Sequence, residues 1–94
     1  GERMRAHLAR VLAQGAPLIV LDEPTAGLDP AQSIAIADIL RAHAEKGGGV
    51  LFSTHDVSLA ARVASEVLLM REGAIIARGA PDAALTEENL QAAY

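Results

Sequence analysis

Two adjacent carboxylates, Asp22 and Glu23, directly follow the apolar run at residues 18–21. Four aliphatic residues in a row predict a strand that is buried on both faces, as in the interior of a parallel sheet. The carboxylates then lie at the C-terminal end of that strand, where open α/β sheets bind their ligands. Because a buried carboxylate needs cations, hydrogen bonds or solvent nearby, the pair suits a magnesium ion and an activated water.

Two further segments contribute candidate residues. The turn at residues 24–29 brings the chain to Asp29, which stands before Pro30 and is a good N-cap for a helix. A second buried strand is predicted over residues 50–53, and Thr54 and His55 follow it. Taken alone, Asp22 and Glu23 could cap a helix at the end of a strand, and His55 could be an ordinary loop histidine.

The elements that must position these residues alternate between helix and strand. Helices are predicted over residues 3–14, 30–46, about 57–64, 81–85 and 86–94, and strands over residues 18–21, 50–53, 67–70 and 74–78. The last two strands are predicted to form a hairpin, and Met4 and Met70 are expected to fill the core. This order predicts an α/β fold that is half of a doubly wound domain.

Composition limits the class of protein. The chain has 94 residues, of which 51% are apolar and 2% aromatic, so we expect at most one small domain with an aliphatic core. A formal net charge of −4 argues against a nucleic-acid-binding module. The sequence has no Cys, which excludes disulfides and Cys-ligated metals. No apolar stretch approaches the roughly 20 residues that a membrane span needs, so membrane association is expected to come through partners.

Taken together, these residues resemble the C-terminal part of an ATP-binding-cassette (ABC) ATPase. Residues 18–22 are similar to the Walker B strand, Glu23 to the catalytic glutamate, residues 26–29 to the D-loop, and His55 to the switch histidine. Gly1 matches the last Gly of the Leu-Ser-Gly-Gly signature loop. The motifs stand in family order over the whole chain. The resemblance implies an α/β fold class: the C-terminal half of a P-loop NTPase domain, with a mostly parallel sheet, flanking helices and a C-terminal β-hairpin.

The resemblance also implies catalytic roles for three of these residues. Asp22 is implied to hold Mg²⁺, through a water, because this ion takes oxygen ligands and keeps much of its hydration. Glu23 is implied to act as the general base for the attacking water. His55 is implied to hydrogen-bond the γ-phosphate of ATP and to sense its loss.

Three other residues are implied to contact nucleotide: Gly1, Glu2 and Asp29. Gly1 lets backbone N–H groups approach phosphate at the start of a helix, on the ATP that the opposite subunit holds. Asp29 is implied to cross to the facing subunit. The active unit of the family is therefore a dimer.

Two family motifs are missing from these residues. No G-x-x-x-x-G-K-[ST] phosphate loop occurs, and the Gln-containing loop is missing as well. Residues 47–49 are all Gly but are not followed by Lys-Ser/Thr, so they are predicted to form a flexible turn. We therefore expect residues 1–94 to be a partial ABC ATPase domain from a longer protein. The isolated chain is expected to bind ATP weakly and to be inactive.

The C-terminal hairpin and the residues after it narrow the predicted function. Residues 67–78 resemble the hairpin of transporter-type ABC ATPases, and residues 84–94 resemble tails of bacterial importers of iron–siderophore, haem or cobalamin. This implies ATP and Mg²⁺ as cofactors, and a second ATPase subunit, transmembrane permease subunits and a substrate-binding protein as partners, with no nucleic acid. It implies a peripheral location at the cytoplasmic face of the bacterial inner membrane. The alternatives are another cargo or export, a DNA or ribosome role, or a non-catalytic segment that pairs with a complete cassette.

Overall fold

The computed structural model describes residues 2–15 and 17–94, with the backbone alone described for Glu2. The chain divides into two compact units, Gly1–His55 and Asp56–Tyr94. The first unit contains, in order, α1 (Glu2–Ala13), β1 (Leu18–Asp22), α2 (Pro30–Glu45) and β2 (Gly49–Ser53). The second contains α3 (Val57–Val63), β3 (Val67–Arg71), β4 (Ala74–Gly79), α4 (Pro81–Ala84) and α5 (Glu87–Ala93). The predicted order of helices and strands is confirmed.

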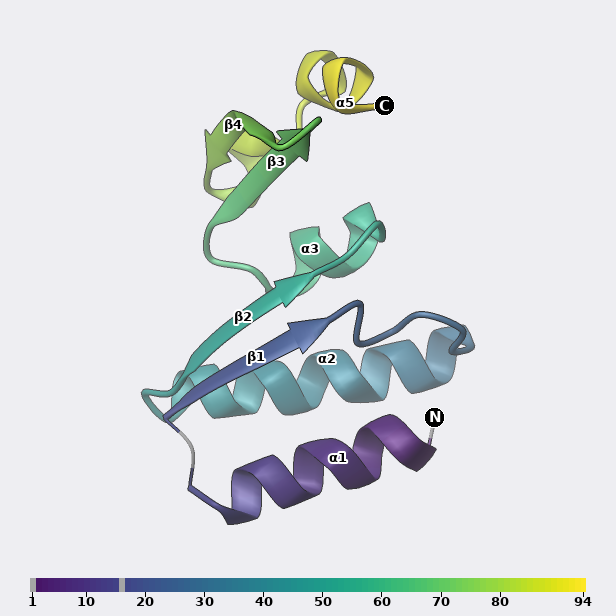
Figure 1. Cartoon of the computed structure of the whole chain (residues 1–94), viewed down its shortest axis with the longest axis vertical. Coiled ribbons are helices and arrows are strands. Elements are labelled where there is room, and N and C mark those ends of the chain that lie inside the picture. Colours follow the sequence, from purple (N-terminus) through teal and green to yellow (C-terminus); the bar gives the residue numbers. More distant parts are fainter. Residues whose placement is uncertain (1, 16) are drawn as a thin grey trace. The chain divides into compact units, whose positions relative to one another are not determined.

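The first unit is built on a parallel pair of strands. β1 and β2 pair in register from Leu18 opposite Gly49 to Asp22 opposite Ser53, and α2 runs beside them (Figure 1). Asp29 is the N-cap of α2, where its side chain accepts from the N–H of Gln32. Because the two strands start and stop together, their C-terminal ends form one edge of the sheet.

The two faces of this sheet differ in exposure. One face and its helices supply the buried side chains of Leu8, Ile19, Leu21, Ile36 and Leu40. On the other face, Leu18, Val20 and Leu51 are 58%, 64% and 60% exposed. The prediction that residues 18–21 are buried on both faces is therefore wrong for this structure. Side chains alternate along a strand, and the described residues cover only one side.

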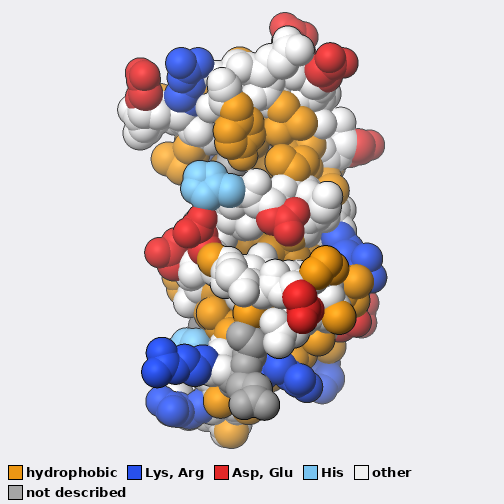
Figure 2. Space-filling view, turned by 90° about the vertical axis from the view of Figure 1, so that its right-hand side faces the viewer, with side chains coloured by type: hydrophobic (Ala, Val, Ile, Leu, Met, Phe, Trp, Pro, Cys, Tyr) orange, Lys and Arg blue, Asp and Glu red, His pale blue; other side chains and the backbone are white. Residues whose placement is uncertain are grey.

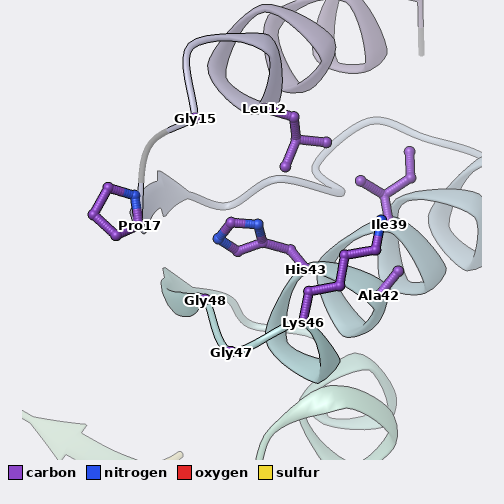
Figure 3. A pocket seen from close by; sticks show the side chains of 9 residues that line it. All are labelled: Leu12, Gly15, Pro17, Ile39, Ala42, His43, Lys46, Gly47 and Gly48. Atoms are coloured by element: carbon purple, nitrogen blue, oxygen red, sulfur yellow. The ribbon is translucent and has the colours of Figure 1, made fainter.

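The turn between α2 and β2 lies at the other end of the strands. A pocket there is lined by Leu12, Gly15, Pro17, Ile39, Ala42, His43, Lys46, Gly47 and Gly48 (Figure 3). Figure 3 shows the His43 imidazole directed into this pocket. Its Nε2 is buried and forms no hydrogen bond with another described residue. Since Pro17 and Gly48 stand before β1 and β2, this pocket lies at the opposite end of the strands from Asp22.

The second unit is a hairpin with three short helices. β3 and β4 pair antiparallel with a register shift between Leu69 and Met70, and a small core forms around Val67, Leu69 and Ala84. Met70 is 57% exposed, so the expectation that it fills the core is wrong, because alternate side chains of β3 point away from that core. Figure 2 shows apolar side chains at the surface among charged ones. In the described part of the chain, no helix combines the length and apolar character that crossing a membrane requires.

Candidate functional site

The candidate site lies where β1 and β2 end. Asp22 is the last residue of β1 and stands opposite Ser53, the last residue of β2. Glu23 and His55 follow these two positions, so the parallel register brings together residues that are about 30 positions apart in the sequence. The sequence predicted Asp22, Glu23 and His55 as candidates, and the structure places all three at this edge.

The Ser53 side chain bridges the two carboxylate residues. Its hydroxyl donates to Oδ1 of Asp22 at 2.5 Å. The same Oγ accepts from the backbone N–H of Glu23 at 3.1 Å, and that N–H also donates to the Ser53 carbonyl at 3.0 Å. The end of β2 therefore holds both the Asp22 side chain and the Glu23 backbone. Sequence reasoning did not assign a role to Ser53, because its position opposite Asp22 depends on strand register.

Glu23 leaves the extended conformation of β1. Its φ is 46°, in the left-handed region, which costs a non-glycine residue roughly 1–2 kcal/mol. The two hydrogen bonds from its N–H to Ser53 offset part of that strain. As the first residue after the strand, Glu23 has its Oε1 3.3 Å from Nε2 of His55. The side chains are 43% and 83% exposed respectively, so water reaches this pair and weakens their mutual attraction.

The segment after Glu23 is anchored rather than extended. Pro24 is fully buried and Thr25 is only 8% exposed. Ala26 N–H donates to the Glu23 carbonyl at 3.1 Å, and Leu28 N–H donates to the Thr25 carbonyl at 3.2 Å. These successive turns carry the chain from the site to the start of α2.

Asp29 ends that segment and takes part in a capping box. Its carboxylate accepts from the Gln32 N–H at 2.8 Å, and the Gln32 side chain accepts from the Asp29 N–H at 3.4 Å. The predicted N-cap is confirmed. The implied contact of Asp29 with nucleotide stays a prediction. Gly1 lies outside the described residues, and Glu2 begins α1 with its side chain outside the description, so their implied nucleotide contacts also stay predictions.

The carboxylates of Asp22 and Glu23 fit a magnesium ion that a bound nucleotide also helps to hold. Within residues 2–15 and 17–94, no three His, Cys, Asp or Glu side chains are grouped so as to hold a metal ion by themselves. Mg²⁺ is usually bound by one or two carboxylates together with waters and substrate phosphates. Ser53 donates a hydrogen bond to one oxygen of Asp22, and Asp22 is exposed at the sheet edge. The arrangement can therefore place a hydrated cation beside a second carboxylate, Glu23.

The curated relatives of this chain include ATP-binding proteins of import systems. Residues 5–61 match a family model described as "AAA domain, putative AbiEii toxin, Type IV TA system". The chain is 44% identical over 99 residues to a hemin import ATP-binding protein of Pseudomonas putida, covering 100% of this chain and 39% of that protein. It is 41% identical over 95 residues to a cobalamin import ATP-binding protein of Halobacterium salinarum, covering 100% of this chain and 24% of that protein.

A solved structure shows the same fold. The structure described as "An inward-facing conformation of a putative metal-chelate type ABC transporter" superposes with a TM-score of 0.89 and 31% identity, covering 98% of this chain and 37% of that chain. The predicted fold class, an α/β P-loop NTPase domain of the ABC type, is confirmed. The chain spans well under half the length of the relatives that it matches.

Proposed function

We propose, from the premise that this chain belongs to the ABC ATPase family, that it forms the catalytic part of an ATP-hydrolysing nucleotide-binding subunit. The observation that carries the proposal is the meeting of Asp22, Glu23 and His55 at one edge of the parallel strands. Phosphoryl transfer to water depends mainly on positioning and on neutralising charge at the γ-phosphate, and these residue types supply both.

Each residue has a distinct role in this proposal. Asp22 holds Mg²⁺ through a water, and the ion neutralises charge on the phosphates when it is bound. Glu23 orients the attacking water and accepts its proton. His55 contacts Oε1 of Glu23 through Nε2 at 3.3 Å. Because a neutral imidazole has one N–H to donate, that N–H holds the base in the absence of nucleotide and donates to the γ-phosphate when ATP is bound. Asp29 and Gly1 contact nucleotide or the facing subunit in a dimer.

The relatives support a narrower proposal for the whole protein. Their names refer to hemin and cobalamin import. We propose that this chain serves a bacterial importer of a metal chelate, such as an iron–siderophore complex, haem or cobalamin. Its partners are a second ATPase subunit, transmembrane permease subunits and a substrate-binding protein. The subunit is peripheral, at the cytoplasmic face of the inner membrane.

The test replaces the proposed base in a complete cassette. Residues 1–94 are placed in the Pseudomonas putida hemin import ATP-binding protein in exchange for its matching segment, and this chimera is used throughout. Glu23→Gln is expected to leave ATP binding intact and to lower turnover by about 10²- to 10⁴-fold, the usual contribution of a general base.

Glu72→Gln is the matched control for that test. Glu72 is an exposed acid that also has a positive φ, 51°, but it lies in the turn between β3 and β4. We expect this variant to hydrolyse ATP at the parent rate. If Glu23→Gln also hydrolyses ATP at the parent rate, Glu23 is not the base, and a non-catalytic pairing segment becomes the better interpretation.

A further inference from the structure

We infer that Ser53 is a positioning residue for the magnesium–nucleotide site, acting through Asp22 and Glu23. This inference rests on the proposed function and adds a residue to it. Ser53 is the last residue of β2 and lies in register with Asp22. Its hydroxyl donates to Oδ1 of Asp22, while its Oγ accepts from the N–H of Glu23. One small side chain therefore touches both proposed catalytic positions.

The hydroxyl of Ser53 can donate one hydrogen bond and accept others, and this determines how it contacts Asp22 and Glu23. A serine hydroxyl has one proton to donate and two lone pairs that can accept. Asp22 Oδ1 takes that proton, and the Glu23 N–H occupies one lone pair. Because hydrogen bonds to a charged group are the stronger kind, the hydroxyl favours one orientation of the Asp22 carboxylate. That orientation leaves the other carboxylate oxygen for a hydrated cation.

The hydrogen bond from the Glu23 N–H to Ser53 Oγ stabilises a strained backbone conformation. At a φ of 46° this residue sits in a region that non-glycine residues rarely adopt. Its N–H is shared between the Ser53 carbonyl and Oγ at 3.0 and 3.1 Å. Without the hydroxyl, only the carbonyl holds the N–H, and the strained turn that aims the Glu23 side chain at His55 is held less firmly.

The sharpest test compares Ser53→Thr with Ser53→Val. The two new side chains have nearly the same shape, and only Thr keeps the hydroxyl. Both are β-branched and suit the end of a strand, so loss of folding is not expected in either. Thermal unfolding of each variant is measured to check that the two are equally folded. Ser65→Ala, at an exposed serine of the segment between α3 and β3, serves as a control for serine loss elsewhere.

The readout is metal binding without turnover. In the Glu23→Gln chimera, Mn²⁺ is titrated in the presence of ATP and followed by electron paramagnetic resonance. We expect Ser53→Val to weaken Mn²⁺ binding by about tenfold, the lower end of what the loss of a hydrogen-bonding partner of a metal ligand costs. Ser53→Thr and Ser65→Ala are expected to stay within about twofold of their parent. In the hydrolysing chimera, Ser53→Val should also raise the Mg²⁺ concentration for half-maximal rate, which a purely structural role would leave unchanged.

Two results would overturn this inference alone, and a third would overturn the proposed function together with it. If the parent binds Mn²⁺ and ATP, and the Thr and Val variants both bind Mn²⁺ as tightly as the parent, the hydroxyl does not position the site. The same conclusion follows if both variants lose binding to the same extent, because shape rather than the hydroxyl then decides. If the parent chimera binds no metal and nucleotide at all, the proposed function fails first and this inference with it.

Discussion

Replacing Gly48 by Ala should destabilise the protein through one contact with His43. A Cβ at residue 48 would lie 2.2, 2.5 and 2.6 Å from Nε2, Cδ2 and Cε1 of the imidazole. An ordinary contact begins near 3.4 Å, so the ring must withdraw by about 1.2 Å. Such overpacking typically costs about 1–3 kcal/mol, part of it from forcing the ring off its rotamer. We expect Gly48→Ala to lower the free energy of unfolding of the chimera by about 2 kcal/mol.

The neighbouring Gly47 provides a matched comparison with a different cause. Its φ is 91°, and a Cβ there meets nothing within 4 Å among the described residues. Gly47→Ala should therefore cost about 1–2 kcal/mol through backbone strain alone. Truncating the imidazole by His43→Ala should remove the penalty at residue 48 and leave the penalty at residue 47 unchanged.

The assay is a double-mutant cycle measured by urea unfolding and far-UV circular dichroism. The coupling between His43→Ala and Gly48→Ala is expected to be at least about 1 kcal/mol, and that between His43→Ala and Gly47→Ala close to zero. A Gly48→Ala penalty that persists in the His43→Ala background would refute this reasoning. A Gly48→Ala variant as stable as the parent would refute it too.

Three further predictions concern the helix cap at Asp29, the side chain of His55 and the isolated chain. Asp29→Ala should lower the free energy of unfolding by about 1 kcal/mol. Asp29→Asn should lower it by much less, because it keeps an acceptor for the Gln32 N–H. Equal losses of the two variants in urea titrations would contradict the capping role. His55→Ala in the chimera should lower turnover and leave ATP affinity within about threefold, because the His55 side chain is 83% exposed and contacts the proposed base. Turnover at the parent rate would remove His55 from the mechanism. The isolated 94-residue chain should bind ATP weakly, since it has no phosphate loop, and micromolar affinity in a calorimetric titration would contradict this.

The local parts of the fold were readable from the sequence because they depend on near neighbours. The cap at Asp29 is satisfied by the backbone N–H three residues further on, so residue type and spacing were enough to predict it. The two apolar runs followed by polar residues likewise predicted β1 and β2. Candidate residues at the strand ends, Asp22, Glu23 and His55, could be chosen from the same local patterns.

Two features were decided only by the tertiary structure. They are the contacts that depend on strand register and the side of each strand that other elements cover. Ser53 reaches Asp22 only because β1 and β2 start together, with Leu18 opposite Gly49, and no local pattern sets that register. The exposed face at Val20 and the exposed Met70 follow from what packs against each strand, which residue type alone does not reveal. The sequence by itself therefore determined which residues could do the chemistry, and pairing between distant segments decided how they meet.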